Sequence, residues 1–396
     1  MTRRTRWART VALGLLLGSL AGCDGEDGPE PVPAPVLDWQ QVDLPVPPGP
    51  DGRLAVRDAT VCGDEWVLVG GVFMTDDLSR PAAWSSPDGS TWTSLTLDPT
   101  DYWAQRSVIW SVACRGDGDL AMVGGKSGGA HGNPRVSSWY QREDGVLVDV
   151  HAGYTLYGGA EATNVSRVAA GPDGYLITGN RVSGAAVWTS TDAREFTLHD
   201  DVPELVSGSD RQTLAIGQMH DGERWTVVGS ASLTDRLARV PMAWTSPDGL
   251  TWTDEQVPRT DEFNDLEQVV PVGDGLVAVG LRGQAYGVWT RDAQGDWGLG
   301  ESFGTVRTSG GSPAVSSLVS LPTEGDDERR LLTSVADGES YQLWASTAAG
   351  AWSRIDVPAA PEVGSERTLN VAARGQDVLL IADDGTQGRL WLATWS

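Results

Sequence analysis

Apolar and polar positions repeat along the chain in short blocks that are typical of β-strands rather than helices. In one block a small, β-branched segment (residues 59–62, ATVC) precedes a Gly/Asp turn and then an apolar segment that ends in glycine (residues 66–70, WVLVG). No stretch of useful length repeats its apolar residues every 3.6 positions, the period of an amphipathic helix. The pattern therefore predicts short strands joined by tight turns, with little helix.

A tryptophan-containing segment comes third in each block and recurs at a period of roughly 50 residues, which marks an array of supersecondary units. Its seven tryptophans are Trp84, Trp139, Trp188, Trp244, Trp289, Trp344 and Trp391. Four short strands per unit, repeated radially, form a β-propeller. We therefore predict an all-β fold: a single seven-bladed β-propeller of four-stranded blades over residues 37–396.

The fourth strand of the last blade is expected from the other end of the chain. Only six fourth-strand segments follow their own tryptophan segments, one fewer than the number of blades. Residues 39–45 (WQQVDLP) have the same form as the fourth-strand segments at residues 252–258 (WTDEQVP) and 352–358 (WSRIDVP). We expect this N-terminal strand to pair into the last blade, which closes the ring and removes an exposed sheet edge.

The first residues have the form of an export signal. Four arginines precede an apolar run at residues 11–18, and residues 20–23 (LAGC) place small side chains at the cut site. These four residues resemble a bacterial lipobox, which implies a lipid on Cys23 and an anchor at a membrane of the bacterial cell envelope, facing its extracytoplasmic side. An ordinary signal peptide is the alternative. Residues 1–23 are thus expected to be a lipoprotein signal peptide, and the Pro- and acid-rich residues 24–36 an extended tether.

The charge of the chain limits its partners. The formal net charge is −25, and removal of residues 1–23, with four arginines and no acid, leaves −29. An acidic surface argues against nucleic acid and against close contact with anionic lipid head groups. Cations, basic proteins and neutral glycans remain possible partners.

Two turns share the sequence Ser-Pro-Asp-Gly-x-Thr-Trp, at residues 86–92 and 246–252. They resemble the Asp-box (BNR) turn of sialidase-like propellers, shortened by one residue, and weaker copies such as residues 191–196 (TDAREF) occur elsewhere. In such propellers these turns lie on the face opposite the active site. An Asp carboxylate can accept from turn amides and Gly supplies positive φ, so a structural role is expected for Asp88, Gly89, Trp92, Asp248, Gly249 and Trp252.

The catalytic residues of sialidase-like enzymes do not map onto this chain. Their Phe/Tyr-Arg-Ile-Pro motif is absent, since no phenylalanine or tyrosine here precedes an arginine. The four histidines are scattered without metal-ligand spacing. We therefore predict no catalytic residue, no metal and no cofactor.

Cys62 and Cys114 each end the first segment of two consecutive blocks. Export places them in an oxidising environment, where two cysteines at equivalent positions suggest a disulfide between neighbouring blades. A disulfide requires its two Cα atoms to lie about 4.4–6.8 Å apart, and the inner strands of neighbouring blades could be farther apart than this. The sequence therefore allows either a disulfide between Cys62 and Cys114 or two free thiols.

The loops opposite the Asp-box turns are the expected place for a ligand. Residues 98–106 carry Tyr102, Trp103 and Arg106, and residues 151–167 carry Tyr154 and Tyr157. The loops between second and third strands add five arginines: Arg80, Arg135, Arg181, Arg239 and Arg282. Aromatic and guanidinium groups at a funnel mouth would suit a glycan, a carboxylate-bearing ligand or a loop of a partner protein. Alternatively, the arginines pair with neighbouring acids and the aromatic rings pack under their own loops.

These observations favour a monomeric, membrane-tethered, extracytoplasmic module that uses a propeller face to bind a protein or glycan at the cell envelope, without catalysis. A divergent sialidase-like glycoside hydrolase and a structural envelope lipoprotein without a discrete ligand are the alternatives. A pair of acids about 5–9.5 Å apart beside a pocket would favour the hydrolase. An aromatic funnel without such a pair would favour binding.

Overall fold

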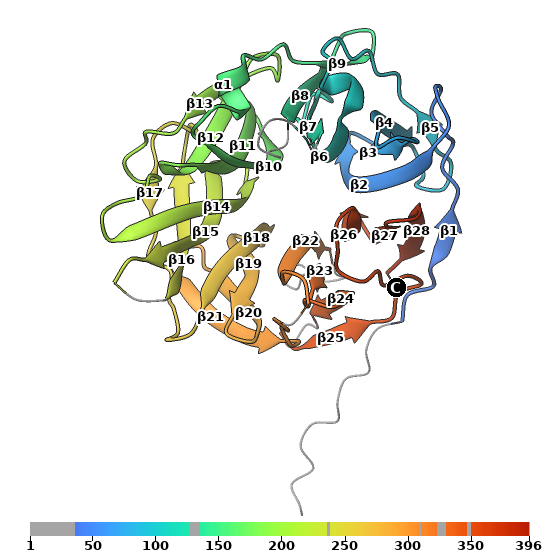
Figure 1. Ribbon diagram of the computed structural model, residues 1–396. Helices are drawn as coiled ribbons and strands as arrows, with labels where there is room; N and C mark the ends of the chain where they lie inside the picture. The colour runs from blue at the N-terminus through green and yellow to red at the C-terminus, as the bar shows by residue number, and fades with distance from the viewer. Residues whose placement is uncertain are drawn as a thin grey trace, which may run out of the picture. The chain divides into compact units, whose positions relative to one another are not determined.

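Seven four-stranded antiparallel sheets follow one another around a ring (Figure 1). The computed structural model describes residues 36–126, 128, 135–235, 238–308, 310–322, 330–346 and 350–395. The prediction of an all-β, seven-bladed propeller is confirmed. The expected signal peptide with Cys23, and the expected tether up to residue 35, lie outside the described residues.

Each blade runs outward from its first strand, which lies nearest the axis. Blade 1 contains β2 (Arg53–Cys62), β3 (Glu65–Phe73), β4 (Ser79–Ser86) and β5 (Thr93–Ser94), and blade 2 contains β6 (Val108–Cys114), β7 (Leu120–Lys126), β8 (Arg135–Gln141) and β9 (Leu147–Asp149). Blade 3 contains β10 (Ala162–Gly171), β11 (Gly174–Arg181), β12 (Gly184–Ser190) and β13 (Thr197–His199), and blade 4 contains β14 (Arg211–His220), β15 (Trp225–Leu233), β16 (Arg239–Ser246) and β17 (Thr253–Asp254).

The remaining blades complete the ring. Blade 5 contains β18 (Asn264–Val272), β19 (Gly275–Arg282), β20 (Ala285–Arg291) and β21 (Trp297–Phe303), and blade 6 contains β22 (Ala314–Leu321), β23 (Arg330–Ala336), β24 (Tyr341–Ser346) and β25 (Trp352–Ile355). Blade 7 contains β26 (Arg367–Arg374), β27 (Asp377–Asp384), β28 (Gly388–Thr394) and the N-terminal strand β1 (Gln40–Val42).

The N-terminal strand closes the ring as the sequence predicts. Strand β1 pairs antiparallel with β28, with Gln41 opposite Trp391 and Val42 opposite Leu390. Figure 1 shows the blue N-terminal strand beside the dark red C-terminal blade. Because the outermost strand of blade 7 comes from the other end of the chain, opening the ring would require breaking these strand hydrogen bonds.

Helix is confined to two short turns in the described residues, η1 (Ala104–Arg106) and α1 (Tyr154–Tyr157). Both lie in loops that enter a blade, η1 before blade 2 and α1 before blade 3. Among the described residues, no helix has the length and apolar character needed to cross a membrane.

Because neighbouring strands of a blade are antiparallel, each loop between strands lies on one of the two faces of the propeller. The loops that enter each blade, such as residues 95–107 and 150–161, lie with the second-to-third-strand turns on what we call the entry face. The first-to-second-strand and third-to-fourth-strand turns, such as residues 63–64 and 87–92, lie on what we call the turn face. The two Ser-Pro-Asp-Gly turns therefore lie opposite the loops in which the sequence predicts a ligand site.

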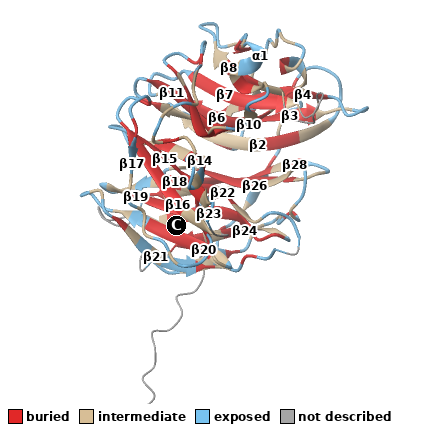
Figure 2. Cartoon of the chain, turned by 60° about the vertical axis from the view of Figure 1, so that its left-hand side comes forward, coloured by how far each residue is buried: buried red, intermediate tan, exposed pale blue. Residues whose placement is uncertain are grey.

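The hydrophobic core is divided among the interfaces between neighbouring blades. Between blades 1 and 2, Val67 and Val69 belong to one cluster with Ile109, Met122 and Trp139. Figure 2 shows buried residues along the strands and exposed residues mainly in the loops. A blade covered on both faces needs apolar side chains at successive positions, and this accounts for the near-continuous apolar second strands in the sequence.

The third-strand tryptophans also fasten the loops of the entry face. Five of the seven are fully buried. In four of these five the indole N–H donates to a backbone carbonyl of the loop that enters the same blade, at 2.8–2.9 Å, as Trp84 does to Pro45. The four are Trp84, Trp188, Trp244 and Trp289. Each indole thus fills the space between blades and holds the entering chain in place.

Bulges in the inner strands direct polar groups toward the axis and toward the next blade. Six of the seven inner strands contain one, at β2, β6, β10, β14, β18 and β22. At the bulge of β10, Ser166 donates to the carbonyl of Ile216 at 2.9 Å, and Arg167 reaches across the axial channel to Asp58 and to the carbonyl of Ser316. Bonds from Arg167 therefore join non-adjacent blades around a central pocket.

A buried carboxyl at one of these bulges should make stability depend on pH. Glu267 is 7% exposed and accepts a hydrogen bond from the backbone N–H of Val315 in blade 6. Burial, and then the nearby charge of Asp265, raise the pKa of Glu267 from 4.5 to about 8. Because the folded state holds this proton more tightly than the unfolded state, its contribution is complete below the unfolded pKa and is lost as pH rises through the folded pKa.

We expect the free energy of unfolding to fall between pH 5 and pH 8, roughly, by up to about 1.4 kcal/mol per pH unit. Glu267→Gln keeps an acceptor for the Val315 N–H and removes the titration, so it should flatten this dependence. Denaturant titrations at several pH values would measure both slopes. An unchanged slope in the variant would show that another group is responsible.

Candidate functional site

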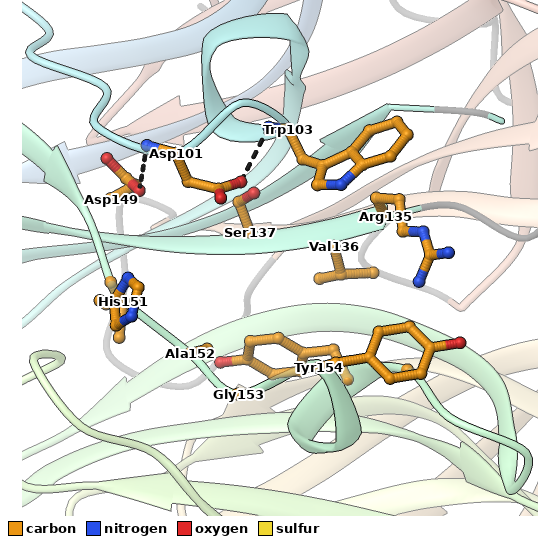
Figure 3. Close-up of a pocket in the computed structure, with 13 residues that line it drawn as sticks. Asp101, Trp103, Arg135, Val136, Ser137, Asp149, His151, Ala152, Gly153 and Tyr154 are labelled. Carbon is orange, nitrogen blue, oxygen red and sulfur yellow. Dashed lines mark hydrogen bonds between the residues drawn. The ribbon is translucent and has the colours of Figure 1, made fainter. Parts of the chain in front are cut away.

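A pocket of about 210 Å³ opens on the entry face of blade 2. Its lining comes from loop 95–107, from the start of β8 and from loop 150–161. Figure 3 shows Trp103 on one side and Tyr154 on the other, with Arg135 near one end and His151 near the opposite end. The structure therefore brings together Trp103, Tyr154 and Tyr157, which the sequence places in two separate loops. The same two loops contain both helical turns of the described chain.

Asp149, at the end of β9, anchors loop 95–107. Its carboxylate is 4% exposed and accepts the backbone N–H of Thr100 at 2.5 Å, the Thr100 hydroxyl and the backbone N–H of Asp101. The Asp101 carboxylate in turn accepts the backbone N–H of Trp103 at 2.8 Å. Two successive carboxylates thus hold the chain in the conformation that begins η1 and directs Trp103 to the pocket.

Aromatic rings and guanidinium groups form a continuous stack beside the pocket. The Arg106 guanidinium lies 3.7 Å from the Tyr102 ring centroid, and the Tyr102 ring meets the Trp103 ring edge to face at 5.1 Å. The Arg135 guanidinium lies 5.5 Å from the Trp103 ring and 4.7 Å from the Tyr154 ring. Cation–π attraction stabilises each of these contacts. The stack joins three separate segments of the chain into one surface.

The two tyrosines of loop 150–161 have different roles in the pocket. Tyr157 is buried, its hydroxyl donates to Ser138 at 2.9 Å, and burial raises the pKa of its phenol. Tyr154 is 63% exposed, and a hydrogen bond and the charge of Arg135 lower the pKa of its phenol. Tyr157 therefore forms a fixed wall, whereas Tyr154 presents its ring to the solvent.

Blade 2 departs from the pattern of the other buried tryptophans. The indole N–H of Trp139 is buried and has no hydrogen-bond partner among the described residues. In blades 1, 3, 4 and 5 the corresponding N–H donates to the entering loop, and blade 2 lacks this bond among the described residues. Leaving a buried N–H unpaired costs about 1–3 kcal/mol, and such departures are concentrated at functional sites.

The other arginines predicted for the entry face do not reach this pocket. Arg80 donates to the backbone carbonyls of Pro47 and Pro50, and Arg239 forms an ion pair with buried Asp265 at 2.8 Å. Arg181 pairs with an acid at 3.5 Å, and Arg282 donates to Ser302. Arg181 and Arg239 thus pair with acids, as the alternative interpretation of the sequence expects, whereas Arg80 and Arg282 bond to backbone carbonyls or a serine. Arg135 joins the stack instead.

On the turn face, the two Ser-Pro-Asp-Gly turns have the same hydrogen bonds. Asp88 accepts the backbone N–H groups of Ser90 and Thr91, both at 2.8 Å, and these bonds lower the pKa of its carboxyl to about 2. Gly89 has φ of 75°, a conformation that only glycine adopts at little cost, and its carbonyl accepts the indole N–H of buried Trp92. Asp248, Gly249 and Trp252 repeat this arrangement.

Cys62 and Cys114 form a disulfide in the structure, with Cα atoms 5.3 Å apart. Both residues precede a first-to-second-strand turn, so the bond joins blades 1 and 2 on the turn face. The inner strands of neighbouring blades therefore do approach closely enough at this edge. Blade 2 is thus covalently fixed on the face opposite its pocket.

A larger pocket of about 510 Å³ lies on the turn face between blades 3 and 4. Several of its polar groups are engaged, since Asp192 and Asp248 accept turn amides and the Tyr175 hydroxyl donates to the carbonyl of Asp119. His220 accepts the backbone N–H of Gly222. None of the described residues that line it carries a guanidinium group, whereas Arg135 lies beside two aromatic rings at the pocket of blade 2.

The acids of the blade 2 pocket are Asp101 and Asp149, and both hold the loop backbone. Carboxylates that accept backbone N–H groups in this way hold a loop in place, whereas a general acid or base must be free to exchange its proton. No cluster of three or more His, Cys, Asp or Glu side chains suited to a metal ion occurs among the described residues. Of the four histidines, His151 lines the pocket, and His131 lies outside the described residues.

Of the residues predicted from the sequence, Trp103, Tyr154 and Tyr157 line the pocket, and Tyr102 and Arg106 stack beside it. The pocket also contains four polar residues that were not predicted: Asp101, Ser137, Asp149 and His151. Asp149 carries no local signal, because an acid at the end of a short strand is common on any surface. Its importance arises from Thr100, which the fold places beside it across 49 positions of sequence.

Comparisons with known proteins add the fold alone. No family model matches the chain, and no curated protein matches it. Similar solved structures include the β-propeller domain of the Trilobed protease from Pyrococcus furiosus (10% identity, 86% of this chain and 93% of that one, TM-score 0.48). A second similar structure is a putative 6-phosphogluconolactonase from Bacteroides uniformis (13% identity, 82% of this chain and 94% of that one, TM-score 0.49). A third is the SapL1 lectin in complex with alpha methyl fucoside (12% identity, 72% of this chain and 92% of that one, TM-score 0.46). At such low identities and TM-scores, none of them bears on the function of this chain.

Proposed function

We propose that this protein is an extracytoplasmic binding module and that the pocket of blade 2 is its ligand site. The observation that supports this most strongly is the stack of Arg106, Tyr102, Trp103, Arg135 and Tyr154 beside the pocket. Exposed aromatic rings cost solvation free energy unless a ligand covers them, and Trp, Tyr and Arg are the residue types that dominate binding sites.

A glycan is the ligand class that this pocket favours. Sugar rings present C–H faces that pack on aromatic rings and hydroxyls that bond to polar side chains, and this pocket combines Trp103 and Tyr154 with Ser137 and His151. The pocket is concave and half polar, whereas a protein partner more often covers a broad, flat surface. A protein loop remains the second candidate because it would use the same aromatic and guanidinium anchors.

The cellular location of the module is part of the proposal. The lipobox-like residues 20–23 would anchor the chain to a membrane through Cys23, and residues 24–36 would hold the propeller away from the bilayer. The Asp-box resemblance of residues 86–92 and 246–252 supports distant kinship with sialidase-like propellers, in which such turns lie opposite the ligand face. The disulfide is consistent with an oxidising compartment.

Trp103→Ala should weaken ligand binding by at least about tenfold, because it removes the ring that forms one wall of the pocket. The purified full chain in detergent would be tested against immobilised dextran, mannan, peptidoglycan, acidic polysaccharides and solubilised envelope proteins. Phe263→Ala is the matched control, since it removes a partly exposed aromatic ring from the entry face beside blade 5. The control should bind as the wild type does.

The same panel separates the alternatives. A polysaccharide bound by the wild type and lost in Trp103→Ala supports the glycan module, and a single envelope protein with this behaviour supports a protein partner. Release of reducing sugar that requires residues of the pocket would support the divergent glycoside hydrolase. Absence of any Trp103-dependent binding would contradict the proposed site and favour a structural lipoprotein.

A further inference from the structure

Two cations, Arg135 in the pocket and Lys126 beside it, lie next to each other in a strongly acidic protein. The chain has 54 acidic residues against 29 lysines and arginines, and Lys126 is its single lysine. Lys126 ends β7 and stands directly opposite Arg135 at the start of β8. Like charges opposite one another on paired strands destabilise a sheet. Acidic residues outnumber basic ones in this chain, yet both residues of this cross-strand pair are cations.

Neither cation is neutralised by the described part of the protein. No described carboxylate lies within ion-pair distance of Arg135, whose contacts are the faces of Trp103 and Tyr154, and its buried Nε has no hydrogen-bond partner there. Lys126 donates to the backbone carbonyl of Asp77 at 2.7 Å. By contrast, Arg181 and Arg239 of the same face each pair with an acid.

The acids of the pocket do not compensate Arg135. The Asp149 carboxylate is enclosed by Thr100 and the backbone N–H of Asp101, and the Asp101 carboxylate accepts the backbone N–H of Trp103. A hydrogen bond with Arg135, and then the charge of Arg135, lower the pKa of the Tyr154 phenol. Two aromatic faces hold the guanidinium plane, and a planar guanidinium binds a carboxylate through two parallel hydrogen bonds.

Adjoining pockets continue from this site toward the axis. A small pocket shares Val136 and Tyr157 with the blade 2 pocket. The next pocket shares Trp110 with that small pocket, and its charged lining residues are Lys126, Arg57 and Glu366. Arg57 forms an ion pair with buried Asp383, so Lys126 is the cation that the inner pocket adds to Arg135. This arrangement fits an extended ligand with repeated negative charge better than a single small anion.

We propose that the ligand is an acidic glycan, a chain with uronic acid units, whose carboxylate is bound by Arg135 while a sugar ring packs on Trp103 (Figure 3). This inference rests on the proposed binding function and narrows its ligand class. Lys126 supplies a second cation for a neighbouring unit. General attraction to a polyanion does not account for such binding, because the protein as a whole repels polyanions.

The test compares polygalacturonate with its methyl-esterified form, which has the same backbone without the charge. Affinity electrophoresis of the full chain in detergent, in gels containing either polymer, measures binding. The wild type should bind the acid form at least about tenfold more tightly than the ester. Arg135→Ala should lose this preference, and Arg135→Lys should keep part of it. Arg259→Ala, an exposed arginine of the entry face beside blade 5, is the control and should behave as the wild type.

Each other result overturns the inference. Equal binding of the acid and the ester, or acid binding that survives in Arg135→Ala, would show that no carboxylate is recognised there. If neither polymer binds while a neutral glycan binds in a Trp103-dependent manner, the ligand is not a uronate chain but the proposed binding function stands. Dextran sulfate is tested in the same way. If it alone binds and its binding depends on Arg135, the ligand is a sulfated glycan and not a uronate chain. If no glycan or protein binds in either experiment, the proposed function fails as well.

Discussion

Replacing Asp149 with alanine is expected to reduce ligand binding by more than about tenfold and to lower the free energy of unfolding by about 2–3 kcal/mol. The buried carboxylate accepts two backbone N–H groups and one hydroxyl from Thr100 and Asp101. Without it these donors lose their acceptor, and the loop that carries Trp103 is no longer held against blade 2. Binding to the immobilised polysaccharide and denaturant unfolding would measure the two effects.

Asp144→Ala is the control for this prediction, because Asp144 is an exposed acid of the same blade that pairs with Arg142 on the surface. Its removal should leave both the stability and the binding close to those of the wild type, because solvent screens an exposed ion pair. Asp149→Asn, which retains one acceptor oxygen, should fall between alanine and the wild type. Full affinity in Asp149→Ala would show that loop 95–107 does not depend on this anchor.

Removing the disulfide should destabilise the propeller by about 4 kcal/mol. The bond joins Cys62 and Cys114 across 52 positions of sequence, so it restricts a long loop of the unfolded chain. The double replacement Cys62→Ser, Cys114→Ser and the reduced wild-type protein should have the same lowered denaturation midpoint. Chemical denaturation with and without reductant would measure this difference.

Ligand binding provides the second measurement for this variant. The disulfide lies on the turn face, away from the pocket, so the folded double variant should bind polysaccharide as the wild type does. A midpoint that reductant does not change in the wild type would contradict a stabilising role. Loss of binding under conditions in which the variant is folded would show that the bond also positions the entry face.

The sequence alone determined most of the fold because the fold is a repeat. A β-branched strand, an apolar strand ending in glycine and a tryptophan strand recur with one period, and each unit must cover the next to bury its apolar surface. Even the closing strand β1 could be recognised, because residues 39–45 resemble the other fourth strands. Local residue types are sufficient when every blade meets the same neighbours.

The candidate site was only partly predictable. Trp103, Arg106 and Tyr154 stood out as aromatic and basic residues in long loops, and the structure brings Trp103 and Tyr154 to one pocket. Among the predicted arginines, however, sequence alone did not distinguish Arg239, which pairs with buried Asp265, from Arg135, which has no described carboxylate within ion-pair distance. Whether an arginine is paired depends on which acids the fold places beside it, and those acids are distant in sequence.

The repeat period, the blade pattern and the N-terminal closing strand were therefore determined by the sequence itself, since local strand and turn preferences repeat unchanged around the ring. Tertiary structure decided the rest. It placed Asp149 beside Thr100, it left the indole N–H of Trp139 without a described partner, and it brought Cys62 within bonding distance of Cys114. Each of these depends on distances between separate strands and loops, which only the packing of blade against blade establishes.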